Sequence, residues 1–225
     1  MKIAIHQPNY LPWAGYFSKI DACDVFVFLD DVQYIKDGYI QRTRIRSEKG
    51  PKWLTCSVDK PSSKCGIDEV THAKTNWLEA HLSTLKNVYG SASFFNEVVE
   101  VIFGKPDELL ADSLAVTNRI LVGRIADYLG IKCKFVLSSE LDVKGASSER
   151  LLNLVKILRG NTYFSGKGAE SYMDHNLFKQ AGIEIQILDY KPIKYEQKGY
   201  DWMPGLSIID ALFYKGPSAI EIIGY

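Results

Sequence analysis

Residues 1–16 read MKIAIHQPNYLPWAGY, in which a short apolar run stops at a segment dense in polar and aromatic side chains. Residues 2–5 have the composition of a buried strand. That strand has to end near Pro8, because proline offers no backbone N–H and disfavours a helical conformation at Gln7. In open α/β sheets, ligands bind beyond the carboxyl ends of the strands. His6 is therefore expected where a titratable side chain can take part in chemistry.

The alternation of strands and helices along the chain predicts the fold class. A second strand is expected at residues 24–29, DVFVFL, and residues 13–22 before it suit about two helical turns. Apolar spacing predicts helices at 76–89, 106–129, 148–159, 174–181 and 206–213, and strands at 133–137, 162–164 and 184–188. This order is typical of α/β proteins. We expect a single domain over residues 1–225, with a mostly parallel layered sheet and flanking helices.

Residues 34–58 depart from this pattern and predict an inserted β-ribbon at the edge of the sheet. Arg42, Arg44 and Arg46 alternate at the period of a strand, which would place three guanidinium groups on one face. Such a face suits a phosphate or a carboxylate, although a solvated ribbon without a ligand explains the pattern equally well. Aromatic residues of the same region can stack on a sugar or a base, namely Trp13, Tyr16, Tyr34 and Tyr39.

The composition argues against several classes of partner. The chain has 27 basic and 27 acidic residues, so it lacks the basic excess that binding to nucleic acid or to an anionic membrane requires. Its four cysteines are scattered, with no CxxC pair, so we expect free thiols and no metal site. No apolar run is long enough for a secretory signal or a membrane span. A soluble, cytoplasmic protein is expected.

His6 and His81 are the candidate acid–base histidines. His6 can act as a general base or orient a substrate oxygen, with Gln7 and Tyr10 as polar neighbours. The alternative is a strand-end histidine bonded to nearby backbone. His81 lies on the apolar stripe of the helix at 76–89, which favours a core histidine with satisfied hydrogen bonds. It becomes a second acid–base group only if that helix lines the cleft.

Asp30 and Asp31 follow the second strand, so their carboxylates should point to opposite sides and only one should face the cleft. That carboxylate can hold a sugar hydroxyl, deprotonate an amine or bind a hydrated magnesium ion, and the alternative is a turn-forming residue. A third carboxylate, Asp210, interrupts the apolar helix at 206–213. We expect Asp210 to be solvated or to cap the helix.

The segment Ser165-Gly166-Lys167-Gly168 follows a predicted strand. Its glycines allow backbone N–H groups to approach an anion, and Lys167 adds a positive charge. A plain turn is the alternative, because the segment lacks the spacing of a phosphate-binding P-loop. The chain also lacks GxSxG, HExxH and GxGxxG motifs, so its motifs indicate a site without identifying the reaction.

Several longer segments resemble the WbqC-like family of bacterial proteins, beginning with IHQPNYLPWAGYFSKI at residues 5–20 and DVFVFLDDVQY at 24–34. The similarity continues through RTRI, WLTCSV, YFSGKGAESYM, FKQAGIEI and LSIIDALFYKG. It implies a role in making O-antigen and related cell-surface polysaccharides. The characteristic residues of the family fall on His6, Gln7, Pro8, Tyr10, Pro12, Trp13, Gly15, Asp30, Asp31, Gln33 and Arg42.

Residues and resemblance together favour an enzyme, a transferase that adds an acyl or aminoacyl group to a nucleotide-linked amino sugar. Its partners would be the sugar nucleotide and the acyl or aminoacyl donor. The catalytic candidates are His6, Asp30, Asp31 and His81. The substrate-binding candidates are Gln7, Tyr10, Trp13, Gln33, Arg42, Arg44, Ser165, Gly166 and Lys167.

In the transferase hypothesis, His6 activates an amine or hydroxyl that Asp30 or Asp31 orients. Arg42 and Arg44 hold the diphosphate. One alternative is ATP-dependent carboxylate activation or nucleotidyl transfer, with Mg²⁺ at Asp30 and Asp31 and a phosphate at residues 165–168. Another alternative is a noncatalytic protein that binds a sugar nucleotide or acts as a scaffold. The first two hypotheses differ in cofactor, and the third predicts binding without turnover.

Overall fold

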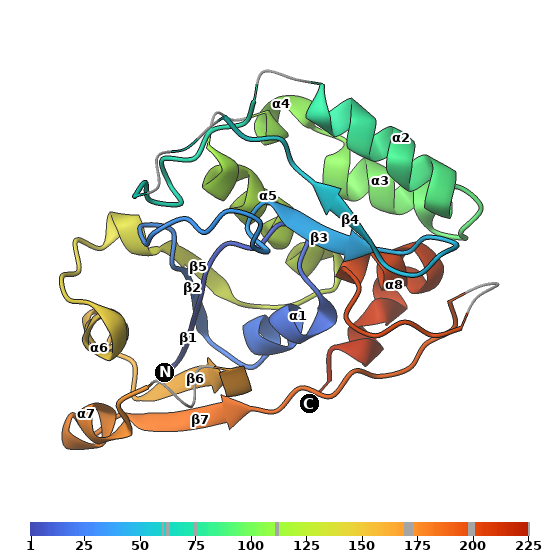
Figure 1. The fold of residues 1–225 in the computed structure, drawn as a ribbon. Coiled ribbons are helices and arrows are strands. Elements are labelled where there is room, and N and C mark those ends of the chain that lie inside the picture. The colour runs from blue at the N-terminus through green and yellow to red at the C-terminus, as the bar shows by residue number, and fades with distance from the viewer. Residues whose placement is uncertain are drawn as a thin grey trace.

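The computed structural model describes residues 1–59, 61, 64–73, 76–110, 113–168, 173–197 and 201–224. Its centre is a five-stranded sheet in the order β5-β2-β1-β6-β7 (Figure 1). The strands are β1 (Lys2–His6), β2 (Val25–Phe28), β5 (Lys134–Leu137), β6 (Thr162–Gly166) and β7 (Glu184–Leu188). All neighbouring strands are parallel, which confirms the predicted α/β class.

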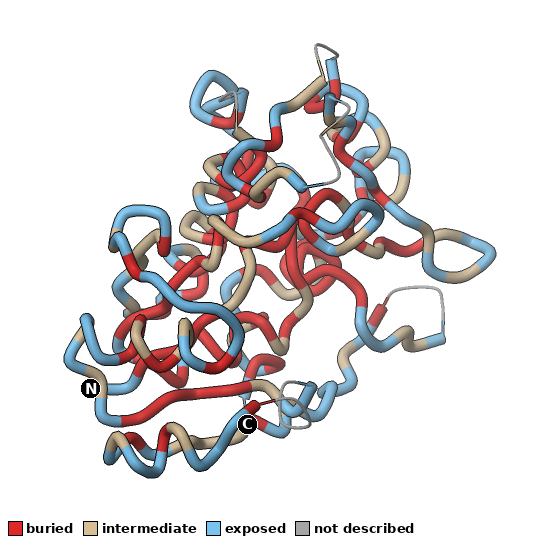
Figure 2. The backbone as a smooth tube through the Cα atoms, turned by 60° about the vertical axis from the view of Figure 1, so that its left-hand side comes forward, coloured by how far each residue is buried: buried red, intermediate tan, exposed pale blue. Residues whose placement is uncertain are grey.

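Alternating side chains of the strands pack against two different helical layers. Ile3 and Ile5 of β1 belong to one apolar cluster, whereas Ala4 between them belongs to the other. The first cluster is completed by α6 (Ser147–Ile157) and α7 (His175–Gln180), and the second by α1 (Ala14–Asp21), α5 (Leu114–Tyr128) and α8 (Ile208–Lys215). Figure 1 shows α6 and α7 on the left of the strands and α1 and α8 on the right. The buried positions in Figure 2 accordingly follow the strands and the inner sides of the helices.

The predicted ribbon consists of β3 (Arg42–Ile45) and β4 (Lys52–Thr55), which pair antiparallel. Its expected position at the edge of the main sheet was wrong, because the two strands form a separate sheet. The ribbon packs on the loop after β1, where the Thr43 hydroxyl donates to the Leu11 carbonyl at 2.9 Å. The buried face of the ribbon, which includes Thr43, therefore also holds in place the loop that carries the predicted site.

The predicted helix at 106–129 is divided into α4 (Pro106–Leu109) and α5. Ser113 has an extended backbone, and the N–H of Leu114 donates to the carbonyl of Val70 instead of to an earlier helical turn. A contact far away in sequence thus overrides a continuous helical pattern. Other helical elements include α2 (Trp77–Tyr89), α3 (Phe95–Phe103), which was not predicted, and the 3₁₀ segments Ser138–Glu140 and Gly216–Ile222.

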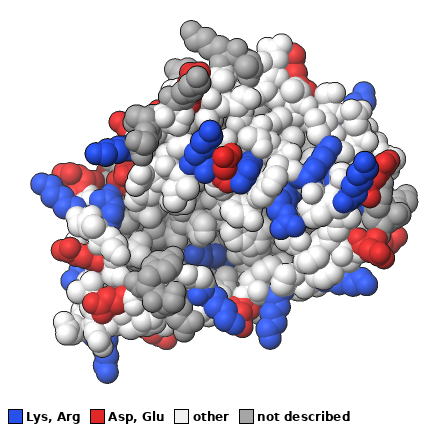
Figure 3. All heavy atoms as spheres, viewed as in Figure 1, with Lys and Arg blue, Asp and Glu red and all other residues white. Residues whose placement is uncertain are grey.

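All four cysteines are free thiols, as predicted. Within the described ranges, no helix has both the length and the apolar character needed to cross a membrane. Basic and acidic side chains are interspersed on the face shown in Figure 3.

Asp210 corrects one prediction, because this carboxylate is fully buried instead of solvated. Its Oδ2 lies 3.6 Å from Nε of Arg46, which is only 1% exposed and so does not share an open face with the other arginines of the ribbon. The hydroxyls of Tyr89 and Tyr195 donate to Asp210 at 2.9 and 2.6 Å. A buried ion pair persists only when such hydrogen bonds compensate for lost hydration, and these bonds join α2, the ribbon and α8.

Removing one partner of this pair leaves the other charge buried without compensation. We expect Asp210→Ala to lower the free energy of unfolding by about 3–5 kcal/mol, measured by urea denaturation. The control is Asp37→Asn, which removes the charge of the half-exposed pair of Asp37 with Arg42 at 3.7 Å, keeps a side chain that tolerates the positive φ of 61° at this position, and should change the free energy by less than about 1 kcal/mol. Similar small losses in both variants would show that the buried network is dispensable.

Candidate functional site

A cleft of about 790 Å³ opens at the carboxyl ends of β1, β6 and β7. It brings together two segments that are about 160 positions apart in the sequence, the end of β1 and the end of β6. Parallel strands with crossover helices place such ends side by side. The predicted site residues that line the cleft are His6, Gln7, Trp13, Ser165, Gly166 and Lys167.

Neither of the paired aspartates is among the described residues that line this cleft. Asp30 is buried and accepts hydrogen bonds from the Ser139 N–H at 3.0 Å and from the Ser139 hydroxyl at 2.7 Å. Asp31 forms an ion pair with Arg150, whose side chain does line the cleft. The Ser138 hydroxyl lies 3.0 Å from Oδ1 of Asp30 and 2.6 Å from Oδ1 of Asp31, so its single proton is shared between the two carboxylates. The aspartates therefore order the segment after β5 and orient Arg150.

Tyr10 and His81 form a buried pair outside the cleft. The Tyr10 hydroxyl lies 2.7 Å from Nδ1 of His81, and Nε2 of His81 lies 3.0 Å from the carbonyl oxygen of Thr55. A carbonyl only accepts, so Nε2 carries the proton and Nδ1 accepts from Tyr10. His81 thus has the satisfied hydrogen bonds of a core histidine, and Tyr10 has no surface in the cleft.

The arginines of the ribbon and Gln33 also lie away from the cleft. Arg42 stacks on the Trp53 ring, with its guanidinium carbon 4.1 Å from the ring centre, and neither Arg42 nor Arg44 is among the lining residues described. Gln33 lines a different cavity of about 830 Å³ together with Gln41. An anion in the cleft would therefore be held by other cations.

His6 stands at the end of β1, where Nδ1–H donates to the carbonyl of Gln7 at 3.1 Å. The ring packs edge-on against Tyr16 and Trp13, at centroid distances of 4.9 and 6.1 Å. Burial, reinforced by the charge of Lys19, lowers the pKa of His6 to about 3, and the hydrogen bond to Gln7 only partly opposes this. The imidazole is therefore neutral near pH 7, with the lone pair on Nε2.

Lys19 is the cleft residue that the sequence analysis missed. It projects from the buried side of α1, is 7% exposed, and donates weakly to the Ile5 carbonyl at 3.4 Å. No carboxylate of the described residues lies within ion-pair distance of it, and burial lowers its pKa to about 8. The sequence feature that could have identified Lys19 is its position between Tyr16 and Ile20 on the apolar stripe of α1.

Other groups add positive potential around Lys19. Ser147 and Ser148 bring the N-terminus of α6 to the cleft, and the residue at its N-cap position, Ala146, makes no capping hydrogen bond. Arg150 and Lys167 also line the cleft, each paired with one carboxylate. Figure 3 shows a hollow on this face with a basic side chain inside it. A helix N-terminus and an unbalanced buried lysine together favour an anionic ligand such as a phosphate.

Comparison with known proteins gives a match over nearly the whole chain. The model of the WbqC-like protein family matches residues 7–222. The uncharacterized protein Rv1507c of Mycobacterium tuberculosis is 34% identical over 226 residues, covering 100% of this chain and 98% of its own length. No solved structure gives a significant match.

The buried charge of Lys19 should cost stability when the cleft is empty. We expect Lys19→Met to raise the free energy of unfolding at pH 7 by about 1–3 kcal/mol, measured by urea denaturation, because a methionine of similar length needs no hydration. Lys86→Met, at an exposed position on α2, is the control and should have little effect.

The pH dependence has a definite sign. The pKa of Lys19 is about 8 in the folded protein and 10.5 ordinarily, so the unfolded chain binds more protons between these values. Stability of the native protein therefore rises over this range, and the advantage of Lys19→Met should shrink between pH 8 and 10.5. An advantage that stays constant across this range would contradict a protonated, uncompensated Lys19.

Proposed function

Because the chain belongs to the WbqC-like protein family, we propose that it works in the biosynthesis of bacterial cell-surface polysaccharide, on a nucleotide-linked amino sugar bound in the cleft. One observation carries the substrate class: Lys19 is buried in the cleft without a carboxylate partner among the described residues. An isolated buried charge is costly, and a substrate anion would compensate it. The phosphates of a sugar nucleotide are such an anion.

The diphosphate would lie between Lys19 and the start of α6. Backbone N–H groups at Ser147 and Ser148 can donate to its oxygens, and Arg150, oriented by Asp31, can bind it from the side. This assignment replaces the arginines of the ribbon, which lie outside the cleft. It leaves the sugar free to extend toward the end of β1.

The reaction would be acyl or aminoacyl transfer to the amine of the sugar. The amine nitrogen forms a bond to the carbonyl carbon, and the bond from this carbon to the leaving group of the donor breaks, with the electron pair going to the leaving group. The proton of the amine passes to Nε2 of His6. A bound phosphate near His6 raises the pKa of the imidazole, so the substrate itself makes His6 a better base.

The ATP-dependent alternative has less support from the geometry. It assigns Mg²⁺ to Asp30 and Asp31, but these carboxylates already accept from Ser138 and Ser139 and pair with Arg150. Within the described residues, no group of three potential metal-ligating side chains is assembled. The noncatalytic alternative uses the same cleft, and turnover is what separates it from the transferase.

Binding of a nucleoside diphosphate should stabilise the protein through Lys19. With uridine or thymidine diphosphate at about 100 times its dissociation constant, we expect the melting temperature to rise by about 5–10 °C. Lys19→Gln should lose most of this shift, and the exposed control Lys86→Gln should keep it. The absence of any shift with either nucleotide would overturn the proposed substrate class.

His6 should be needed for turnover more than for binding. Sugar nucleotides that stabilise the protein are incubated with acyl and aminoacyl donors, and the products are identified by mass spectrometry. For a productive pair, we expect His6→Gln to lower kcat by about 100-fold or more while the thermal shift by the sugar nucleotide persists. Full activity of His6→Gln would rule out His6 as the base.

A further inference from the structure

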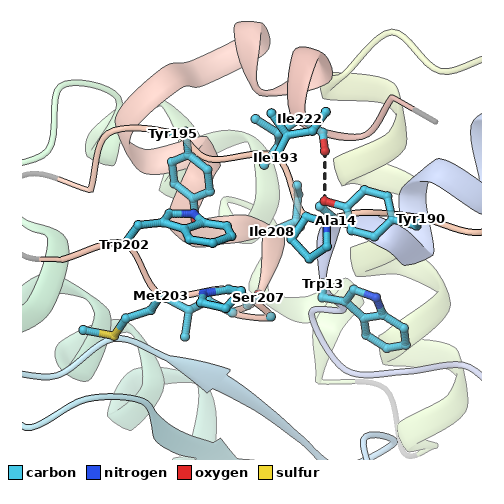
Figure 4. Close-up of a pocket in the computed structure, with 14 residues that line it drawn as sticks. Trp13, Ala14, Tyr190, Ile193, Tyr195, Trp202, Met203, Ser207, Ile208 and Ile222 are labelled. Atoms are coloured by element: carbon cyan, nitrogen blue, oxygen red, sulfur yellow. Dashed lines mark hydrogen bonds between the residues drawn. The ribbon is translucent and has the colours of Figure 1, made fainter.

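A second, smaller pocket of about 280 Å³ adjoins the cleft (Figure 4). It lies between the chain that follows β7 and the segment that leads into α8. Trp13 and Tyr190 line both this pocket and the cleft, so the two spaces share a wall. We name it the Trp202 pocket, after the indole that forms its far side in Figure 4.

The interior of the Trp202 pocket is apolar because its hydroxyl groups are engaged elsewhere. The Tyr190 hydroxyl donates to the Ile222 carbonyl at 3.0 Å, as the dashed line in Figure 4 shows. The Tyr195 hydroxyl donates to Asp210 at 2.6 Å, and the Ser207 hydroxyl donates to a loop carbonyl at 2.6 Å. The lining residues described include no charged side chain. Apart from the indole N–H of Trp202, which has no hydrogen-bond partner among the described residues, aromatic, proline and aliphatic surfaces are what remain for a ligand.

The walls of this pocket are held in place by buried polar groups. The side chain of Gln197 bonds both backbone groups of Met203, at 2.7 Å to the N–H and 3.3 Å to the carbonyl oxygen. The same amide donates to Asp210 at 3.0 Å. Asp210 therefore holds the two chain segments of the pocket at a fixed separation. A preformed pocket loses less entropy on binding than one that must be ordered.

The shared wall requires a glycine in α1. A Cβ atom at Gly15 would lie 2.6 Å from Cδ1 of Tyr190 and 2.8 Å from Nε1 of Trp13, both too close for any side chain. Trp13 also contacts the His6 ring from the cleft side. A group that fills the pocket and reaches past Trp13 and Tyr190 would thus meet the sugar next to His6.

We infer that the Trp202 pocket binds the acyl group of the donor, and that this group is uncharged and apolar, not aminoacyl. The inference rests on the proposed transfer reaction and narrows its donor. An aminoacyl ammonium would lose its hydration in this pocket without a carboxylate from the described lining residues, and this cost exceeds the cation–π attraction of the aromatic rings. The size of the pocket suits one part of a substrate, since sites for whole small molecules begin near about 300 Å³.

Butyramide and its cationic analogue γ-aminobutyramide test the pocket directly, without turnover. The chain has four tryptophans, so a ¹H–¹⁵N spectrum of the labelled protein has four indole signals. Butyramide should shift those of Trp13 and Trp202, which line the pocket, and leave those of Trp53 and Trp77 unchanged. We expect a dissociation constant of about 10 mM, and binding of γ-aminobutyramide at least about 5-fold weaker.

Ile193→Asp provides the matched variant, because Ile193 lines the pocket and is 41% exposed, so the substitution is compatible with folding. A carboxylate there should reverse the preference, changing the affinity ratio of the two amides by about 10-fold toward γ-aminobutyramide. Ile157→Asp, at a position 51% exposed on α6, is the control and should keep the native ratio.

The outcomes separate this inference from the proposed function. If neither amide shifts the indoles of Trp13 and Trp202 while a nucleoside diphosphate still stabilises the protein through Lys19, the pocket assignment fails and the cleft assignment stands. Equal or tighter binding of γ-aminobutyramide to the native protein would also overturn the inference, because it would show that a cation is accepted. Loss of nucleotide stabilisation with retained butyramide binding would instead count against the proposed substrate.

Discussion

The backbone of the loop after β1 has to be satisfied by hydrogen bonds from distant parts of the chain, and the rest of the structure is arranged around this requirement. The Leu11 carbonyl accepts from the Thr43 and Ser207 hydroxyls, at 2.9 and 2.6 Å. The Asn118 amide donates to the Pro8 carbonyl at 2.8 Å. A buried loop is stable only when such groups are paired. Here the pairing joins the ribbon, α5 and α8 to the loop, and Leu11 itself adopts a positive φ of 41° within it.

Two buried cations of this protein differ in whether a carboxylate of the described residues compensates their charge. The charge of Arg46 is compensated by Asp210, which also accepts hydrogen bonds from Tyr89 and Tyr195. This charge is therefore paired within the fold and is not available to a ligand. Lys19 has no such partner among the described residues, and its cost remains until an anion arrives. The same electrostatic argument explains why Arg46 stabilises the fold, and it supports the proposal that Lys19 binds an anion. The buried pair of Arg46 and Asp210 also bears on the Trp202 pocket, because Asp210 supports the walls of that pocket.

The α/β class, most of the strands and helices and the position of His6 at a strand end could be predicted, because each depends on short-range periodicity and on proline and glycine. The end of β6 was also predicted as part of a site, and it meets the end of β1 in the cleft. The arginine pattern was misleading. Alternating spacing predicts that residues share one face of a strand, but it does not predict which other parts of the chain cover that face. Arg46, moreover, lies beyond the end of β3 and is buried.

By itself, the sequence determined most of the strands and helices and which loop follows the first strand, since these follow from neighbours a few residues apart. The break between α4 and α5 is an exception, because a distant contact sets it. Only the tertiary structure decided which charged groups are buried and which are compensated. Asp31 meets Arg150, and Asp210 meets Arg46, across more than a hundred residues. The physical reason is that burial and pairing are properties of the packed chain. In the sequence, Lys19 is an ordinary helical lysine. Its burial results from the packing of α1 against the sheet.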